Sequence, residues 1–332
     1  MEIGAHLRVP VRDRSDVAYV RTALRAIGAG ARNDDVERAE LVATELGTNL
    51  VKHTTAGGEI LIRSAGMPGA RSIELIALDR GPGMDLDRCL PDGFSSAGSP
   101  GTGLGAIRRL SAVFDAYSTP EGTVVLARVG AKTREVVSAF DIGGVSVIKD
   151  GEPVCGDAWA VHEDDAEMTV LVADGLGHGP GASEAARAAV NVPVDWNGDA
   201  SCAGVLERMH GAIRHTRGAA AAVAHVRRGA ATLSFAGVGN VAAIVVTAAA
   251  QRHAVSNPGT LGHQVRLFRE YTYPWTHDAM LVLFTDGLIT HWTIQDLPRL
   301  RHRHPAVVAA ALYRDHSRQR DDVTVVVLKE AA

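Results

Sequence analysis

The sequence is poor in aromatic residues, which make up 5% of its 332 residues, whereas 46% of the residues are hydrophobic. Its cores must therefore be built mainly from Ala, Val, Leu and Ile. No long block of Lys or Arg occurs, and the formal net charge is −4. The composition thus gives no electrostatic support to a nucleic-acid partner. No run of about 18 apolar residues is free of charge, so we expect neither a membrane span nor a membrane partner.

Cysteine is also scarce. Cys89, Cys155 and Cys202 form neither a C-x-x-C pair nor an even-numbered disulfide framework. This usage is typical of a reducing, cytoplasmic compartment. The N-terminal residues lack the apolar core of a signal peptide, which agrees with that expectation.

The length predicts about two domains, at roughly 100–200 residues each. The pattern of strands and helices restarts near residues 131–136, so we expect one domain over 1–132 and another over 136–330. In the first domain, hydrophobic periodicity predicts helices at 15–30, 33–53 and 104–118, and strands at 8–12, 59–65, 72–79 and 121–130. The second helix has capping-box spacing at its start, with Asp34 three residues before Glu37.

The second domain alternates strands and helices in the same way. Strands are expected at 140–151, 157–175, 219–249, 279–287 and 323–329, and helices at 182–190, 202–216 and 305–317. The whole chain is therefore expected to be of the α+β class.

A first candidate site begins on the second expected helix. Glu45, Asn49 and His53 are spaced by four residues and share one face. The alternative is an ordinary amphipathic helix with a solvated stripe. The strand at 72–79 then ends in D-R-G-P-G. Its Asp79 could accept a hydrogen bond from the exocyclic amine of adenine, and the following glycines would let the backbone approach the ring and ribose.

A second glycine string, S-P-G-T-G-L-G, precedes the next helix. Glycines at a helix N-terminus suit phosphate binding through exposed N–H groups and the helix dipole. Either string alone is a weak signal. The ordered set of E-x-x-x-N, D-x-G-x-G and G-x-G-x-G is specific, and it predicts a nucleotide site in the first domain.

This set resembles the GHKL ATPase family, whose Bergerat fold packs helices on one face of a mixed sheet. ELGTNLVKH and PGTGLGAIRRL are most similar to the boxes of short switch kinases of the RsbT and SpoIIAB type. The resemblance implies ATP with Mg²⁺: Asn49 would ligate the metal, Asp79 would read adenine, and Glu45 would polarise the attacking hydroxyl as a general base. The remaining implied cofactor residues are His53, Gly81, Gly83, Gly101, Thr102, Gly103, Leu104 and Gly105.

Other members of that superfamily fit less well. A sensor histidine kinase needs a phosphoacceptor histidine on an upstream helix, and the only upstream histidine is His6, in a strand-like segment. Gyrase, Hsp90 and MutL types need a transducer domain, which the second half does not resemble. A Ser/Thr protein kinase or an anti-sigma binding module remains.

A second candidate site consists of aspartates at strand ends in the second domain. These are Asp157, Asp174, Asp286, Asp321 and Asp322. Clustered carboxylates repel one another unless a cation neutralises them, and hard oxygen ligands favour Mg²⁺ or Mn²⁺. Gly175 would add a backbone carbonyl. The alternative is that each aspartate simply begins a turn, as Asp-Gly commonly does.

The pattern GD, DGLGHG, GVGN, TDG and RDDVTVVV resembles the metal-dependent Ser/Thr phosphatases, and most closely the SpoIIE and RsbX branch, over residues 137–329. The resemblance implies a four-layer α-β-β-α sandwich with two Mn²⁺ or Mg²⁺ ions. The implied metal shell is Asp157, Asp174, Gly175, Asp286 and Asp321, with Asp322 the less favoured of its pair. His178 would orient the phosphate or protonate the leaving oxygen, or else is a turn histidine bonded to backbone.

Together the two resemblances imply a bacterial partner-switching regulator that joins a kinase to a phosphatase. The implied partner is a STAS-domain phosphoprotein of the anti-sigma antagonist type, with a sigma factor or downstream signalling protein beyond it. Relatives of the first half also form homodimers. Two alternatives stay open: a phosphatase whose first domain only binds ATP and a protein, and an adaptor with degenerate sites. Intact Glu45 and Asn49 and the full acidic set argue against the adaptor.

Overall fold

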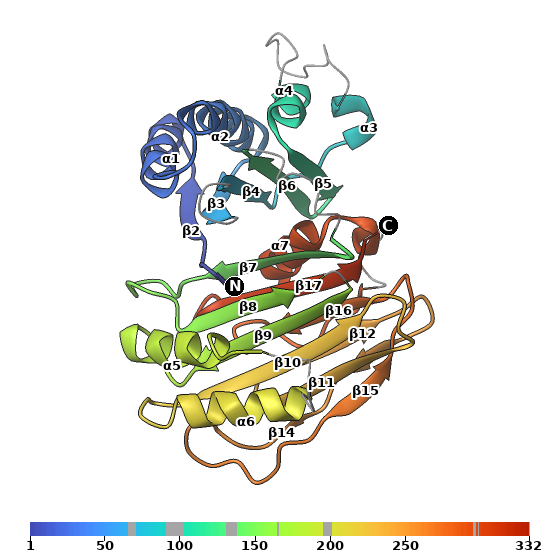
Figure 1. Ribbon diagram of the computed structural model, residues 1–332. Helices are drawn as coiled ribbons and strands as arrows, with labels where there is room; N and C mark the ends of the chain where they lie inside the picture. The colour runs from blue at the N-terminus through green and yellow to red at the C-terminus, as the bar shows by residue number, and fades with distance from the viewer. Residues whose placement is uncertain are drawn as a thin grey trace. The chain divides into compact units, whose positions relative to one another are not determined.

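The computed structural model describes residues 1–65, 71–90, 103–130, 138–164, 166–194, 201–294, 297 and 299–331 (Figure 1). The chain is α+β and forms two compact units. One unit comprises His6–Val136 together with His302–Arg314, and the other comprises Met1–Ala5, Val137–Arg301 and Asp315–Ala332. Each unit therefore contains a short segment from a distant part of the sequence.

The sheet of the first unit has the strand order β2-β3-β4-β6-β5. The strands are β2 (Leu7–Val11), β3 (Gly58–Ala65), β4 (Ser72–Asp79), β5 (Val113–Thr119) and β6 (Gly122–Val129). All four pairings are antiparallel, and the parallel pairing that a mixed sheet would require is absent from these described strands. The pairing of β5 with β6 has a local reason, because these strands follow each other as a tight hairpin and tight turns join antiparallel strands.

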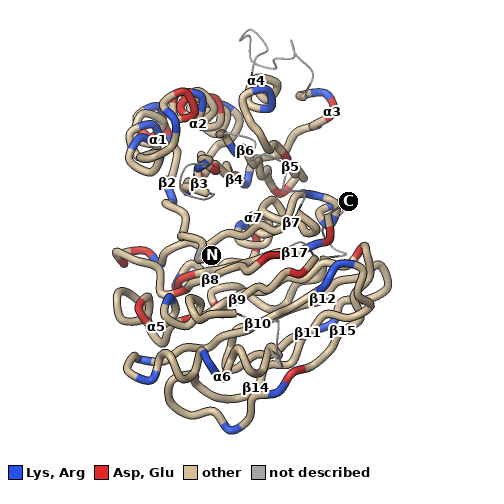
Figure 2. Tube along the Cα trace, viewed as in Figure 1, with Lys and Arg blue, Asp and Glu red and all other residues tan. Residues whose placement is uncertain are grey.

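Helices cover one face of this sheet. They are α1 (Arg14–Ile27), α2 (Asn33–His53), the short α3 (Leu86–Cys89) and α4 (Gly103–Leu110). Figure 1 shows α1 and α2 side by side over the sheet. The apolar core lies between these helices and the sheet. The strands contribute alternate residues to it, such as Ile60, Ile62 and Leu75, all fully buried. Charged residues of both signs occur along α1 and α2 (Figure 2), as the balanced composition requires.

The start of α2 corrects one expectation from the sequence. The capping box expected at Asp34 and Glu37 is not formed, because α2 already begins at Asn33 and its N-cap residue Arg32 makes no side-chain cap. A capping box does occur at the start of α1, where Asp13 and Asp16 satisfy each other's backbone N–H groups.

The helix expected over 104–118 was wrong in its second half. Helix α4 ends at Leu110, and Val113–Thr119 forms strand β5. Val113 and Phe114 are β-branched and aromatic residues that favour a strand. The turn into β6 also requires a glycine, since Gly122 has φ +140° and a Cβ there would lie 2.0 Å from the carbonyl oxygen of Asp79.

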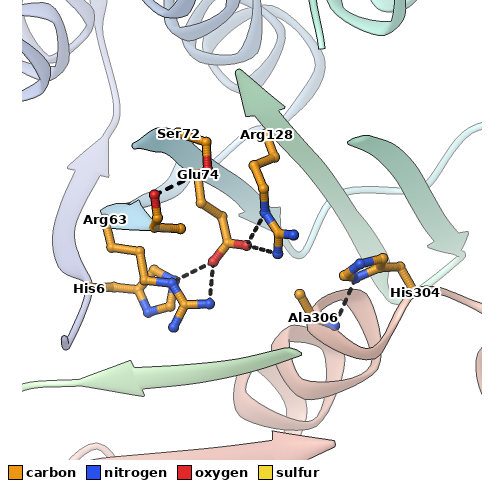
Figure 3. A network of polar contacts seen from close by, with 8 residues as sticks. His6, Arg63, Ser72, Glu74, Arg128, His304 and Ala306 are labelled. Atoms are coloured by element: carbon orange, nitrogen blue, oxygen red, sulfur yellow. Dashed lines mark hydrogen bonds and ion pairs between the residues drawn. The ribbon is translucent and has the colours of Figure 1, made fainter. Parts of the chain in front are cut away.

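The other face of this sheet carries a buried charge cluster (Figure 3). Glu74 is fully buried, with its carboxylate 2.6 Å from Arg63 and 2.5 Å from Arg128. His6 lies 3.3 Å from the same carboxylate. Burial opposes ionisation of Glu74, but the two guanidinium groups outweigh it and hold the pKa of Glu74 well below its usual range.

The segment His302–Arg314 completes the first unit. The backbone N–H of His304 donates to Asp115 Oδ2 at 2.6 Å, and Arg303 pairs with Asp115 at 3.3 Å. The Arg80 guanidinium donates to the carbonyl oxygen of Arg314. Most of this segment belongs to helix α7 (Pro305–His316), which follows a short 3₁₀ turn at Leu300–His302. Sequence periodicity predicted the helix but not these partners.

The second unit contains two sheets. The larger has the order β1-β8-β9-β10-β11-β14, with β15 also paired to β11, and the smaller has the order β13-β12-β16-β17-β7. The larger sheet consists of β1 (Glu2–Ile3), β8 (Asp157–Glu163), β9 (Glu167–Gly175), β10 (Ala219–Arg227), β11 (Thr232–Val238), β14 (Ser256–Asn257) and β15 (Tyr271–Pro274). The smaller consists of β7 (Phe140–Val147), β12 (Ala242–Val246), β13 (Gln251–His253), β16 (Met280–Phe284) and β17 (Val323–Glu330).

Two apolar cores hold this unit together. Trp159, Phe235 and Leu283 belong to the core between the two sheets. Helices α5 (Pro180–Val190) and α6 (Cys202–Ala212) close a second core over the larger sheet (Figure 1). The pairing of N-terminal β1 with β8 was not predicted from the sequence. No helix in the described ranges has both the length and the apolar character needed to cross a lipid bilayer.

Candidate active sites

A pocket in the first unit brings together five residues expected in a nucleotide site. Asn49 and His53 of α2, Asp79 and Gly83 after β4, and Leu104 of α4 all line it. Leu46, Leu50, Met84 and Val125 supply its apolar walls. An apolar pocket with a few polar groups is the usual form of a small-molecule site.

Asp79 is held in a fixed orientation at the rim of this pocket. Its Oδ1 accepts hydrogen bonds from the backbone N–H groups of Gly81 at 2.8 Å and Thr123 at 3.2 Å. Its Oδ2 accepts none from the described part of the chain. A carboxylate with one oxygen fixed and the other available is suited to accept from an amine such as that of adenine.

Helix α4 begins beside the polar face of α2. A Cβ at Gly103 would lie 3.9 Å from Glu45 Oε2 and 3.9 Å from the side-chain amide of Asn49. Gly105 is buried within α4. Gly101 and Thr102 lie outside the described residues. The structure thus places Glu45, Asn49 and the first turn of α4 next to one another.

Two of the expected nucleotide-site glycines lie in the turn after Asp79. Gly83 has φ +72°, and a Cβ there would lie 2.2 Å from the carbonyl oxygen of Thr119. A Cβ at Gly81 would lie 3.1 Å from Asp79 Oδ1 and 3.2 Å from a methyl group of Thr54. Gly83 is therefore required by the backbone itself, whereas Gly81 keeps space beside the aspartate.

In the second unit, the aspartates lie at strand ends that the fold brings together. Asp157 of β8 and Asp174 of β9 are direct partners in the antiparallel register. Asp286 follows β16, and the turn that it begins packs on Asp322, because a Cβ at Gly287 would lie 2.0 Å from the Asp322 carbonyl oxygen. The sequence pattern predicted this convergence.

These carboxylates act on one another electrostatically. Burial and the charges of Asp286, Asp321 and Asp322 raise the pKa of Asp174 to about 7. Burial, followed by the charge of Asp174, raises the pKa of Asp157 well above its usual value. Five carboxylates that disfavour each other's ionisation form a site where a cation would be strongly stabilised.

Four of the five carboxylates accept hydrogen bonds from neighbouring groups, among them Asp321, whose Oδ1 accepts from the Asp322 N–H at 3.0 Å. The buried Thr285 hydroxyl donates to Asp157 Oδ2 at 2.8 Å, and the Asn240 amide donates to Asp286 Oδ2 at 2.6 Å. Asp322 accepts from two backbone N–H groups, those of Lys149 and Gly156, each at 2.9 Å. Asp322 therefore stabilises the loop between Lys149 and Gly156. Its neighbour Asp321 is exposed.

The donor set fits a hard divalent cation. All the side chains are carboxylates, and a cation would relieve the repulsion that raises the pKa of Asp174. Within the described ranges, no three His, Cys, Asp or Glu side chains are gathered closely enough to hold one ion. The aspartates are thus coupled at longer range, and their side chains would have to turn inward to coordinate a metal.

Gly175 follows Asp174 and has a packing role that sequence analysis missed. A Cβ at this position would lie 2.0 Å from the carbonyl oxygen of Ala182 in α5. Its N–H donates to the carbonyl oxygen of Gly156 at 3.1 Å. Glycine is therefore required for α5 to approach β9, and the use of its carbonyl as a metal ligand stays a prediction.

His178 lies in the turn after Gly175 and has a carboxylate partner. Its Nδ1 is 2.6 Å from Glu152 Oε1, and half of the His178 side chain is exposed. Of the two interpretations from sequence, neither foresaw Glu152, for which the motifs carry no signal. Asn240 and Thr285 could have been found, because one ends the GVGN motif and the other directly precedes Asp286.

Two family models match separate parts of the chain. The model of the histidine kinase-like ATPase domain matches residues 10–129, and that of stage II sporulation protein E (SpoIIE) matches residues 164–330. The phosphoserine phosphatase RsbX of Bacillus subtilis (strain 168) is 28% identical over 141 residues, which are 42% of this chain and 70% of RsbX. The serine/threonine-protein kinase RsbT of the same organism is 34% identical over 95 residues, which are 28% of this chain and 71% of RsbT.

Solved structures share the fold of more than half of the chain. A structure from work on the bacterial stressosome as a modular system superposes with a TM-score of 0.53 and 25% identity, covering 57% of this chain and 99% of that chain. RsbX in complex with magnesium superposes with a TM-score of 0.50 and 22% identity, covering 58% of this chain and 96% of that chain. These likenesses confirm the α+β sandwich expected from the sequence.

Proposed function

Since the chain belongs to the SpoIIE family and also carries a histidine kinase-like ATPase domain, we propose that it both phosphorylates and dephosphorylates serine or threonine in a partner protein. The joining of a kinase-like ATPase domain to a PP2C-type phosphatase domain is a partner-switching architecture. We take the catalytic modules to be residues 1–132 and 136–330. The proposed partner is a STAS-domain phosphoprotein of the anti-sigma antagonist type.

The proposed phosphatase site uses the carboxylates at the strand ends. Asp157, Asp174, Asp286 and Asp321, with the carbonyl of Gly175, would hold two Mg²⁺ or Mn²⁺ ions. Such ions, when bound, supply Lewis-acid polarisation of the phosphate and lower the pKa of a nucleophilic water. The complex of the relative RsbX with magnesium supports this assignment.

The protein's own groups then position the reactants. Thr285 and Asn240 each donate a hydrogen bond to one oxygen of Asp157 and Asp286, which leaves the other oxygen of each carboxylate for a metal ion. Glu152 holds the His178 ring through Nδ1, which leaves Nε2 to act on the leaving serine oxygen. The exposed position of His178 is suited to a protein substrate rather than a buried small molecule.

The proposed kinase site uses the pocket between α2, β4 and α4. Asp79 Oδ2 would accept from the adenine amine, and Asn49 would hold Mg²⁺ at the phosphates of ATP. Glu45, beside Asn49, would polarise the hydroxyl of the partner protein. The proximity of Gly103 to both side chains supports this arrangement. The relative RsbT, a serine/threonine-protein kinase, supports the same chemistry.

One observation carries the phosphatase proposal: separated strand ends bring aspartates together, and burial together with the charges of Asp286, Asp321 and Asp322 raises the pKa of Asp174 to about 7. Hydrolysis of an aryl phosphate with Mn²⁺ tests it. We expect activity in the full chain and in the control Asp141→Ala, whose carboxylate is exposed on β7, and loss in Asp174→Ala and Asp286→Ala. Activity that survives both substitutions would remove the proposed site.

Label transfer from radiolabelled ATP to a STAS-domain protein tests the kinase proposal. Glu45→Ala should abolish transfer, whereas Glu37→Ala, an exposed position on the same helix, should leave it unchanged. Tight binding of the STAS-domain protein without any transfer would instead indicate that the first domain is a binding module.

A further inference from the structure

The backbone of Arg217 lies beside the turn that follows Asp174. It precedes strand β10, whose first residue Ala219 pairs with Gly175. The Gly218 carbonyl accepts a hydrogen bond from the Leu176 N–H at 3.0 Å, and the Arg217 carbonyl accepts one from the His263 ring at 2.9 Å. The backbone on both sides of the Arg217 side chain is therefore tied to neighbouring loops.

The Arg217 guanidinium lies over two glycines of that turn. A Cβ at Gly181 would be 2.7 Å from Nε and 2.9 Å from Cζ of Arg217, and a Cβ at Gly177 would be 3.5 Å from Nη1. Gly181 lies in the first turn of α5 and its φ is not positive, so its backbone does not demand glycine. The space above Gly181 is what the guanidinium occupies.

Among the residues that the structure describes, this guanidinium has no hydrogen-bond or ion-pair partner. In the ranges that the structure describes, no carboxylate or carbonyl oxygen pairs with its nitrogen atoms, and the side chain is exposed. Its neighbour in the turn, His178, is by contrast paired with Glu152. An exposed arginine that keeps its donors unused beside an acidic site is arranged to bind an anion.

We propose that Arg217 binds the phosphate group of the phosphoprotein substrate and orients it toward Asp174 and its neighbouring carboxylates. The inference rests on the proposed phosphatase function. A guanidinium presents two parallel N–H donors that match two phosphate oxygens, and its charge offsets the dianion of phosphoserine. Because residues 177 and 181 have no side chains, the guanidinium has room beside the turn, and Arg217 stays exposed to solvent.

Arg217→Gln removes the charge and keeps a hydrogen-bonding side chain, and Arg214→Gln is its matched control, an exposed arginine three residues earlier. With Mn²⁺ present, we expect Arg217→Gln to raise KM for a phosphoserine peptide by about ten- to a hundredfold, the usual effect of a lost charged hydrogen bond. The change in kcat should be much smaller. Arg214→Gln should behave like the wild type.

Inorganic orthophosphate is the probe for binding itself. Calorimetry on the full chain with Mg²⁺ should show weaker orthophosphate binding in Arg217→Gln by the same factor, with an intermediate value for Arg217→Lys. Gly181→Ala provides a second variant that keeps the arginine, because its Cβ would displace the guanidinium. It should weaken orthophosphate binding without lowering Tm, and it should add little to Arg217→Gln.

The outcomes separate this inference from the proposed function. If the wild type hydrolyses phosphoserine and Arg217→Gln retains both KM and orthophosphate affinity, Arg217 is not a phosphate ligand. If Arg217→Gln lowers Tm and kcat while orthophosphate affinity is unchanged, the residue only supports the turn, and the inference is again wrong. If the wild type itself has no phosphatase activity, the proposed function fails, and the calorimetric comparison still decides the role of Arg217.

Discussion

Asp157 and Asp174 are direct partners across strands β8 and β9, so two carboxylates occupy opposing positions at one end of an antiparallel ladder. Like charges directly opposite each other destabilise a sheet. Here the burial of both groups and the further charges of Asp286 and Asp321 increase that cost. Such an arrangement is stabilised by a cation, and it makes the protein's stability depend on pH and metal together.

Metal-free protein should lose stability as the pH rises toward neutrality. The pKa of Asp174 is raised to about 7 in the folded state, above the ordinary value of 3.8. Between these values the folded state binds more protons than the unfolded state, so the free energy of unfolding falls with rising pH. The loss should amount to a few kcal/mol, at about 1.4 kcal/mol per pKa unit.

Chemical denaturation in chelator near pH 5 and about pH 8 measures this effect. Asp174→Asn should show a smaller loss than the wild type over the same range. Mn²⁺ should restore wild-type stability at the higher pH and have less effect on the variant. Equal pH dependence in the two proteins would show that Asp174 is not the group responsible.

The buried Glu74 cluster should have the opposite pH dependence, with a loss of stability in acid. The pKa of Glu74 lies well below its ordinary value of 4.5, so its stabilising contribution is present above that pH and is lost as the pH falls through the folded value. At neutral pH, Glu74→Gln should cost about 3–5 kcal/mol, because it leaves Arg63 buried without a counter-charge.

Glu59→Gln is the matched control for Glu74→Gln. Glu59 lies 3.6 Å from Arg8 on the same sheet but both side chains are partly exposed, so this substitution should cost less than about 1 kcal/mol. The difference between wild type and Glu74→Gln should shrink below about pH 4. A Glu74→Gln protein as stable as Glu59→Gln at neutral pH would contradict the assigned role of the buried cluster.

Asp79 should make the nucleotide pocket selective for the adenine amine. Its Oδ1 is already bonded to two backbone N–H groups, which leaves Oδ2 for the ligand. We expect the wild type to bind ATP at least about tenfold more tightly than inosine triphosphate, which lacks that amine. Asp79→Asn should remove this preference, as measured by fluorescence competition. Equal affinity of the wild type for both nucleotides would show that Asp79 does not read the base.

Gly175 should tolerate no side chain. A Cβ would lie 2.0 Å from the Ala182 carbonyl oxygen, so Gly175→Ala should destabilise the protein by about 1–3 kcal/mol and lower phosphatase activity. Gly211→Ala is the control, since a Cβ in that helical position meets no atom within 4 Å. It should leave activity unchanged and increase stability slightly, by up to about 1 kcal/mol. Equal stability of the two variants, measured as Tm, would contradict the packing of α5 against Gly175.

The sequence predicted those features that depend on strong local patterns. Aspartates at the ends of buried strands located Asp174 and Asp286, and the Gly-Asp pair before β8 located Asp157. The sheet topology then brought Asp157 and Asp174 together. The glycine strings placed Asp79 and Leu104 at one pocket. The expected helix over 104–118 was wrong after Leu110, where Val113–Thr119 pairs with β6 as a hairpin that local periodicity did not reveal.

Long-range contacts could not be predicted in this way. The pairing of β1 with β8 and the bond between Asp115 and His304 join segments more than 150 residues apart, and neither leaves a local pattern. Glu152 and Arg217 were missed for the same reason, because the loops that carry them meet the DGLGHG turn only in the folded chain.

The most direct measurement follows phosphate release from a serine-phosphorylated STAS-domain protein in the presence of Mn²⁺. Wild type and Glu45→Ala should release phosphate at the same rate, whereas Asp174→Asn should release almost none. Equal release by Asp174→Asn, or loss of release in Glu45→Ala, would contradict the division of the chain into separate kinase and phosphatase sites.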